Sequence, residues 1–272
     1  MILTNLLVGC ALNDGQSTYS GWQLIWSDEF DSGSKPVYPD SYNWGYERGY
    51  VRNEEWQYYT DSLENAYCQN GMLHIRALKH PAGTFPTGKH PHQDGSISSA
   101  SLRSLRKVEH CYGKLEMRAR IDTRLGSWPA FWTLGAKGHW PDCGECDIME
   151  YYRGMLKFNV AWQPAEGGEY ILWDSEVVQL SQLESNWADK FHIWTMEWSP
   201  EFVKLYLDGE LKNEWSGYQD DSPYGNSIEG FRQRHYIILN QAVGGTEGGD
   251  ASGIEYPTNY EIDWVRWYQK KQ

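Results

Sequence analysis

The sequence predicts an all-β protein, a sandwich of two antiparallel sheets, from three observations. Helical periodicity is scarce, and short runs that alternate between apolar and polar residues take its place. Asn70-Gly71 and Asp208-Gly209, which favour tight hairpin turns, stand between such runs. The 27 glycines and 11 prolines fit a chain rich in loops.

Alternating runs locate the strands. We expect strands over residues 22–26, 72–77, 113–121, 192–198 and 203–207, with a further strand over 143–151. In the third run Leu115, Met117 and Ala119 fall on one face and charged residues on the other, the pattern of a half-buried antiparallel strand. Residues 81–95 and 244–253 are rich in glycine and polar residues, and we expect long loops there.

Length and composition favour one domain. With 272 residues and no change of composition along the chain, residues 21–272 are predicted to form a single catalytic β-sandwich domain. Residues 1–20 read as a leader and a polar tether. Within them Leu6-Leu7-Val8-Gly9-Cys10 resembles a bacterial lipobox, although the usual basic start is missing.

The lipobox-like segment indicates where the protein is expected to be located in or outside the cell. If Cys10 is lipidated, the protein is exported and anchored at the bacterial cell surface or in the periplasm; otherwise we expect secretion. An apolar remnant without a targeting role is the alternative. Lipid at Cys10 is the only membrane contact expected, because no apolar run approaches the ~20 residues of a membrane span.

The net charge limits the kinds of molecule that the protein is expected to bind. The net charge of −13 argues against nucleic acid and anionic membranes, and more weakly against sulfated polysaccharides. A neutral polysaccharide fits best, and we expect a monomer.

Cys143 and Cys146 have the spacing of a redox or zinc half-site, but they lie in a predicted strand with no second pair, so idle thiols are expected.

The most informative segment runs from Gly144 to Glu150 and holds three carboxylates, Glu145, Asp147 and Glu150. Crowded carboxylates repel one another, so a fold that keeps them together usually needs them. Retaining glycoside hydrolysis uses two carboxyl groups, one as nucleophile and one as proton donor. Strict alternation would turn Glu150 away from Glu145, so we predict a β-bulge near Ile148-Met149 that returns it to the same face.

These residues resemble a known family. Glu145-x-Asp147-x-x-Glu150 is similar to the bulged signature of the laminarinase/licheninase-like branch of glycoside hydrolase family 16. Further matching blocks follow in the family's order, at residues 26–30, 53–60, 64–65, 70–71, 112–116, 128–132, 140–144, 239–245 and 263–269.

The resemblance implies a β-jelly-roll with an open concave cleft, and endo-acting, retaining hydrolysis of a β-linked polysaccharide. By position, Glu145 is the nucleophile, Glu150 the acid/base and Asp147 the assistant between them. We expect Glu145 to be ionised at neutral pH and Glu150 to hold a proton, because the charges of Glu145 and Asp147 would raise the pKa of Glu150.

Five further residues are expected to contact the sugar. Trp128, Trp132 and Trp140 are predicted to stack on sugar rings, with burial in the sandwich core as the alternative. The resemblance implies that Asn53 binds a sugar on the non-reducing side, and that Tyr152 lines the leaving-group side.

The resemblance also has implications for a bound metal ion and for the glycosidic linkage that is cleaved. No catalytic cofactor is implied, but many relatives bind a structural calcium, for which Glu29, Gly71 and Asp263 are the corresponding positions. The chain departs from its relatives at residues 61–63, where many have an arginine, and at residues 158–162, where many have a histidine. These departures leave the preferred glycan open.

Three functions are therefore weighed. An endo-β-glucanase for β-1,3- or mixed β-1,3/1,4-glucan is favoured. A galactanase of the agarase or carrageenase type is the alternative, although a sulfated substrate would call for cations in the cleft. A non-catalytic glycan-binding protein is disfavoured, because such a protein would be expected to have lost part of the carboxylate trio.

Overall fold

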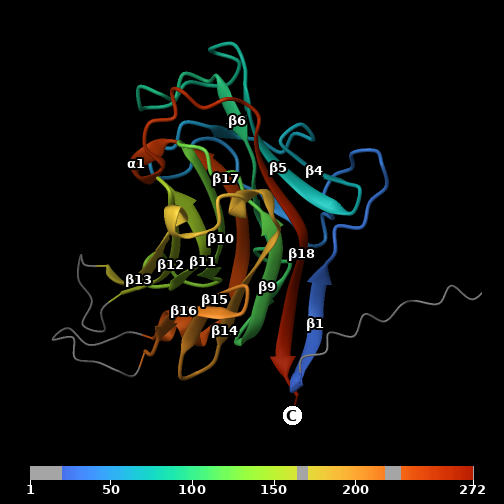
Figure 1. Cartoon of the computed structure of the whole chain (residues 1–272), viewed down its shortest axis with the longest axis vertical. Coiled ribbons are helices and arrows are strands. Elements are labelled where there is room, and N and C mark those ends of the chain that lie inside the picture. Colours follow the sequence, from blue (N-terminus) through green and yellow to red (C-terminus); the bar gives the residue numbers. More distant parts are fainter. Residues whose placement is uncertain (1–19, 164–170, 218–227, 272) are drawn as a thin grey trace, which may run out of the picture.

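The computed structural model describes residues 20–163, 171–217 and 228–271. The described chain is mostly β-strand, arranged as two stacked antiparallel-rich sheets that do not close into a barrel (Figure 1). This confirms the predicted all-β jelly-roll sandwich. Cys10 and the predicted leader and tether up to residue 19 lie outside the described residues.

The first sheet contains ten of the described strands. In spatial order they are β16 (Glu210–Trp215), β15 (Val203–Leu207), β14 (His192–Trp198), β9 (Gly113–Arg120), β18 (Thr258–Lys270), β5 (Met72–Lys79), β6 (Ile97–Ser99) and β3 (Tyr58–Tyr59), with β1 (Trp22–Asp28) paired to β18 and β4 (Ala66–Gln69) paired to β5.

The second sheet contains eight of them and carries the cleft described below. Its order is β13 (Leu172–Gln179), β12 (Met155–Trp162), β11 (Glu145–Tyr152), β10 (Ser127–Gly135), β17 (His235–Val243), β7 (Ser101–Arg103) and β2 (Gly45–Tyr46), with β8 (Glu109–His110) paired to β17. Helices are short: η1 (Leu180–Gln182), η2 (Trp187–Asp189), η3 (Glu229–Arg232) and α1 (Gly245–Gly248), which follows the end of β17 (Figure 1).

The six predicted strands are confirmed, each within two residues at either end. Both predicted hairpin turns are confirmed as well. Asn70-Gly71 joins β4 to β5 and Asp208-Gly209 joins β15 to β16, and all four residues have the positive φ that such turns require.

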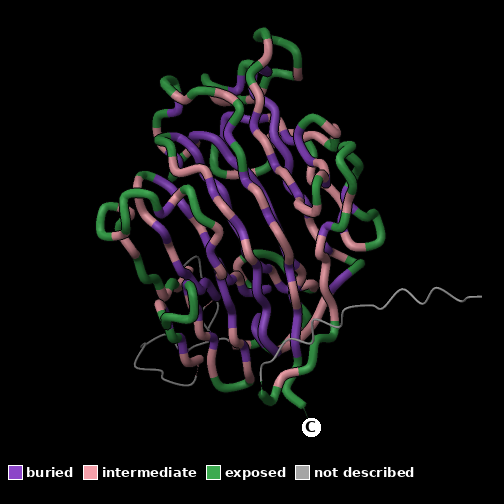
Figure 2. The backbone as a smooth tube through the Cα atoms, turned by 45° about the vertical axis from the view of Figure 1, so that its right-hand side comes forward, coloured by how far each residue is buried: buried purple, intermediate pink, exposed green. Residues whose placement is uncertain are grey.

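The core lies between the sheets and is rich in aromatic residues. Trp194, Trp267, Phe131 and Phe158 have no solvent exposure. Buried residues recur along the strands of both sheets (Figure 2). Burial of such large rings is the main favourable term for a fold of this kind.

One expectation about β9 was wrong. Its charged face was predicted to be exposed, yet Lys114 and Glu116 are each only 3% exposed. They form an ion pair of 3.3 Å, and the Lys114 ammonium lies 4.8 Å from the centre of the Tyr268 ring and 5.6 Å from that of Trp22. Large aromatic side chains from β18 and β1 cover this face, which alternation within β9 alone does not reveal.

The bulge in β11 offers a first test of how the fold positions its carboxylates. Deletion of Ile148 should remove the extra residue and turn Glu150 from the cleft towards the core, because a shift of one residue exchanges the two faces of a strand. We expect loss of hydrolytic activity and a melting temperature lower by ten degrees or more, measured by differential scanning calorimetry.

Deletion of Gly253 serves as the control, because this residue is exposed in a loop outside the strands and a Cβ atom there would meet nothing within 4 Å. That variant should lose far less stability. An active Ile148 deletion would contradict the role assigned to the bulge.

Candidate active site

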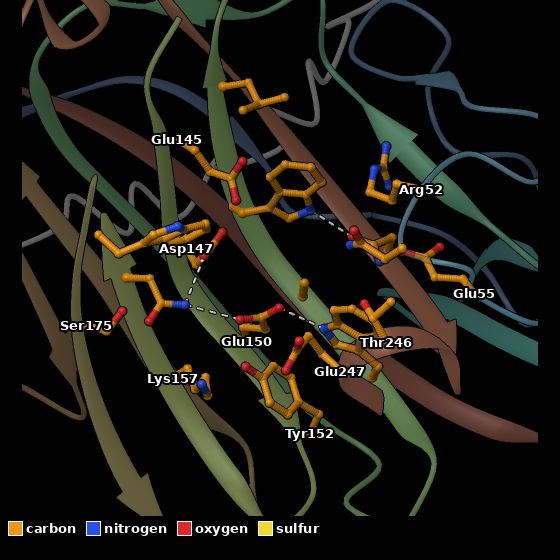
Figure 3. Close-up of a pocket in the computed structure, with 18 of the residues that line it drawn as sticks. Arg52, Glu55, Glu145, Asp147, Glu150, Tyr152, Lys157, Ser175, Thr246 and Glu247 are labelled. Carbon is orange, nitrogen blue, oxygen red and sulfur yellow. Dashed lines mark hydrogen bonds between the residues drawn. The ribbon is translucent and has the colours of Figure 1, made fainter. Parts of the chain in front are cut away.

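The site is organised by the predicted bulge in β11, which the strand pairing confirms. Between Asp147 and Glu150 the chain advances three residues on β11 against two on β12, from Asn159 to Lys157. The register with β10 shifts at the same place. The extra residue restores the phase of alternation, and the side chains of all three carboxylates line the same face (Figure 3).

The opposite face of β11 belongs to the core. Cys146, Ile148 and Met149 have no exposed surface. The site is therefore built on a strand whose inner side is anchored by close packing, which limits movement of the carboxylates.

A glycine sets the entry to β11. Gly144 has a φ of 74°, and a Cβ atom there would lie 3.0 Å from the Phe231 ring and 3.1 Å from the carbonyl carbon of Gly230. Only glycine suits both the backbone angle and the space. This turn directs Glu145, the first residue of the strand, into the cleft.

The cleft has a volume of about 740 Å³, and all eight residues predicted for catalysis and substrate binding line it. They are Asn53, Trp128, Trp132, Trp140, Glu145, Asp147, Glu150 and Tyr152. The structure thus brings the predicted set together, while the role of each residue stays a prediction.

Sequence reasoning missed the other lining residues, which are Arg52, Glu55, Ala130, Leu134, Lys157, Asn159, Trp173, Ser175, Asn240, Thr246 and Glu247. Single polar residues in a strand carry little signal of their own. Once β12 is paired with β11, however, alternation places Lys157 and Asn159 on the cleft face beside Glu150 and Asp147.

Hydrogen bonds hold the carboxylates in place. The indole N–H of Trp128 donates to Glu150 Oε1 at 2.8 Å, and the indole of Trp140 donates to Glu145. The Asn159 amide donates to Asp147 Oδ2 at 3.0 Å and to Glu150 Oε2 at 3.2 Å (Figure 3). Each carboxylate therefore has at least one neutral donor.

The three tryptophans differ in exposure. Trp128 is 4% and Trp132 is 8% exposed, so most of each ring is buried although both line the cleft. Trp140 is 47% exposed and offers an open ring face. The indole of Trp132 donates to Asn240 Oδ1 at 2.7 Å, and the Arg52 guanidinium lies 5.0 Å from its ring centre.

Burial dominates the electrostatics of the trio. It raises the pKa of Glu150 to about 8, with help from the charge of Asp147 and against the opposing effects of Trp128 and Lys157. Burial also raises the pKa of Asp147 to about 6, although the hydrogen bond from Asn159 works against it. At neutral pH Glu150 therefore holds a proton, as expected.

The surroundings of Glu145 oppose the ionisation that is expected of it. Burial, followed by the charges of Asp147 and Glu150, holds its pKa well above its usual range. Glu145 is hydrogen-bonded to Asp147, a contact that raises the pKa of Glu145 and lowers that of Asp147. Glu145 and Asp147 therefore compete for a proton, and the expected ionisation of Glu145 stays a prediction.

The rim of the cleft is held by contacts between distant segments. Asn53 has a φ of 53°, and its carbonyl accepts a hydrogen bond from the Thr246 amide at 2.8 Å. A Cβ atom on Gly245 would lie 2.6 Å from that carbonyl oxygen, so a glycine is needed for the close approach. α1 thereby positions Asn53 at the edge of the cleft.

Tyr152 is buried at the other end of β11. Its ring lies edge-on to Trp128, with centres 5.5 Å apart, and its hydroxyl donates to Glu247 of α1. The Lys157 ammonium lies 4.7 Å from the Tyr152 ring centre. The side chain is 5% exposed, so it contributes mainly to the wall around Glu150.

The residues predicted for calcium are engaged elsewhere. Glu29 accepts two hydrogen bonds from Arg266, at 2.9 and 2.8 Å, and Asp263 pairs with Arg118 at 2.5 Å. Among the described residues, no group of three or more His, Cys, Asp and Glu side chains could hold a metal ion. Two carboxylates already neutralised by arginines do not fit a calcium site, so the structure gives this prediction no support.

The thiols of Cys143 and Cys146 are buried, as predicted. Cys143 and Cys146 are buried and unpaired, as is Cys68, and burial raises the pKa of all three. A protonated, buried thiol is a poor nucleophile and a poor metal ligand.

A jelly-roll sandwich whose open cleft holds two glutamates and an aspartate on one strand is the architecture of a β-sandwich glycoside hydrolase. The comparison with known families places it further. The sequence model of the glycosyl hydrolases family 16 matches residues 50–266, and the chain belongs to this family.

Similar proteins carry related names. The chain is 31% identical to glucan endo-1,3-beta-glucosidase A1 of Niallia circulans, over 93% of this chain but 38% of that protein. It is 30% identical to the beta-glucanase of Rhodothermus marinus, over 98% of this chain and 93% of that protein. It is also 30% identical to the keratan-sulfate endo-1,4-beta-galactosidase of Sphingobacterium multivorum, over 95% of this chain and 58% of that protein.

A solved structure agrees. The laminarinase catalytic domain of Thermotoga maritima superposes with a TM-score of 0.76 at 30% identity, over 92% of this chain and 99% of that one.

Asn159 offers a test of the electrostatics. Asn159→Leu removes the hydrogen bond that lowers the pKa of Asp147, so Asp147 should titrate above its present value of about 6. Carbon-13 NMR of the labelled aspartate carboxyl groups follows this titration without relying on activity. Asn259→Leu, at an exposed position of β18, is the control and should leave it unchanged. An unchanged titration in Asn159→Leu would refute the assigned contact.

Glu150 offers a test by stability. Its folded-state pKa of about 8 lies above the ordinary 4.5, so ionisation of Glu150 costs stability as pH rises between these values. Glu150→Gln lacks this cost. The melting temperature of Glu150→Gln minus that of the wild type should therefore be larger by several degrees at pH 8.5 than at pH 5.

The measurement is differential scanning calorimetry at both values, with Glu176→Gln on exposed β13 as the control. A melting-temperature difference independent of pH would contradict the raised pKa.

Proposed function

We propose that this protein is a retaining, endo-acting glycoside hydrolase that cleaves β-1,3- or mixed β-1,3/1,4-glucan. The observation that carries the proposal is the bulged strand that turns Glu145, Asp147 and Glu150 into one open cleft. Membership of family 16 and the glucanase names of relatives in Niallia circulans and Rhodothermus marinus support the substrate class.

The layout of the cleft supports endo action. Polar residues line it on both sides of the carboxylates, with Arg52 and Glu55 on one side and Ser175 on the other (Figure 3). A polysaccharide can therefore lie across the trio and extend in both directions. A site for exo action would instead need a wall on one side of the reacting bond.

The chemistry follows from the proton positions. The ionised carboxylate of Glu145 attacks the anomeric carbon, and Asp147 lies between it and Glu150 along the strand. Glu150 gives its proton to the leaving oxygen as the glycosidic bond breaks, which yields a glycosyl ester on Glu145.

In the second step the Glu150 carboxylate takes a proton from water, which attacks the anomeric carbon and releases Glu145. Lys157 and the indole of Trp128 both lower the pKa of Glu150, so they favour its carboxylate in this second role.

A galactanase is the second candidate. The similarity to a keratan-sulfate endo-1,4-beta-galactosidase favours it, as do the two cations that line the cleft, Arg52 and Lys157. Against it stands the net charge of −13. A glycan-binding protein without activity is the least favoured, because the complete trio is present.

We further propose export, with lipidation at Cys10, on the strength of residues 6–10. Within the described part of the chain, none of the helices has the length and apolar character needed to cross a membrane. We also propose that the protein acts as a monomer. We propose no structural calcium ion, because Glu29 and Asp263 are held by arginines.

The decisive experiment incubates the purified protein with laminarin, barley-type mixed-linkage glucan, agarose and keratan sulfate, and sizes the products over time. Short oligosaccharides should appear early from one or both glucans, and activity should fall as pH rises through about 8, where Glu150 loses its proton. Products from the galactans alone would move the protein to the second candidate.

Glu145→Gln should lower turnover at least a thousandfold while binding is retained, because the amide cannot form the glycosyl ester. Glu176→Gln on exposed β13 is the matched control and should keep full activity. A Glu145→Gln variant with undiminished turnover would show that Glu145 is not the nucleophile.

A further inference from the structure

Trp173 of β13 is unusual among the tryptophans of the described chain. It is 47% exposed, lines the cleft, and lies on the edge strand of the second sheet. Trp140 is the other exposed tryptophan, and its indole is already engaged with Glu145. An exposed indole on a cleft wall leaves a large apolar surface in water, which a sugar ring can cover.

Strand pairing places Trp173 in line with the catalytic strand. Trp173 lies opposite Ala161 of β12, and Ala161 lies opposite Glu145 of β11. Two strand spacings, about 10 Å, therefore separate the backbones at Trp173 and Glu145. Trp173 therefore lies in the same cross-strand row as Glu145.

The next cross-strand row supplies polar groups. Asp147 pairs with Asn159, which pairs with Ser175 of β13. The Asn159 amide nitrogen is used by the carboxylates, but its Oδ1 is buried and has no hydrogen-bond partner. Buried acceptors normally have donors, so this atom indicates a ligand that supplies one. The exposed Ser175 hydroxyl lies beside it.

We propose that Trp173, Ser175 and Asn159 form a sugar-binding subsite between β11 and the β13 edge. A neutral pyranose would rest its apolar face on Trp173, donate a hydroxyl to Asn159 Oδ1, and exchange a hydrogen bond with Ser175. The subsite rests on the proposed hydrolase function and extends it. It determines how much of the polysaccharide is held on the side of the cleft opposite Arg52 and Glu55.

The test measures binding without turnover. Oligosaccharides of two to six sugars, from whichever polymer the wild type cleaves, are titrated calorimetrically into Glu145→Gln and into the same variant with Trp173→Ala. If no polymer is cleaved, laminarin oligosaccharides are used. Trp173→Ala should weaken binding of the longer oligosaccharides about tenfold, and Trp173→Phe should recover most of the loss.

Tyr42→Ala is the control, because Tyr42 is 86% exposed and does not line the cleft. Affinities within twofold of the parent in Trp173→Ala, or no binding of any oligosaccharide by Glu145→Gln, would overturn the subsite. Absence of hydrolysis by the wild type would count against the proposed function. The two failures are distinguishable because the subsite is judged by binding alone.

Discussion

The structure depends on one constraint: three carboxyl groups of one strand must line the same cleft. Each must also be protonated or ionised at the step of the reaction that needs it. An ordinary strand cannot meet it, because Glu145 and Glu150 would lie on opposite faces. One extra residue between Asp147 and Glu150 changes this. The neighbouring strands follow the same irregularity, so the catalytic geometry is inseparable from the pairing of the whole sheet.

Neutral donors, rather than opposing charges, hold the trio together. Two indoles and one amide contact the carboxylates, and each hydrogen bond favours the ionised form without supplying a full positive charge. A bidentate arginine in the same place would fix the carboxylates as anions. The donors found here leave Glu150 able to give up a proton in the first step and to take one in the second, as the two-step chemistry requires.

Much of this could be predicted from the sequence. Alternation and hairpin signals located the strands, and the carboxylate spacing located the site and its bulge. What failed depends on neighbours distant in the chain. Burial of Lys114 by aromatic residues of β18 and β1, the engagement of Glu29 by Arg266, and the raised pKa of Glu145 all arise from tertiary packing. Asn159 and Trp173 carry no local signal and become visible only when β11, β12 and β13 are aligned.

The position of β18 has a consequence for synthesis of the protein. Residues 258–270 form a strand that pairs with β9, β5 and β1, so the first sheet has no continuous centre until this strand is in place. The sandwich cannot close while the ribosome still holds these residues. Closure of the sandwich therefore waits for residues 258–270 and is dominated by distant contacts, which makes folding slow. A chain of this design stays open until its synthesis has passed residue 270.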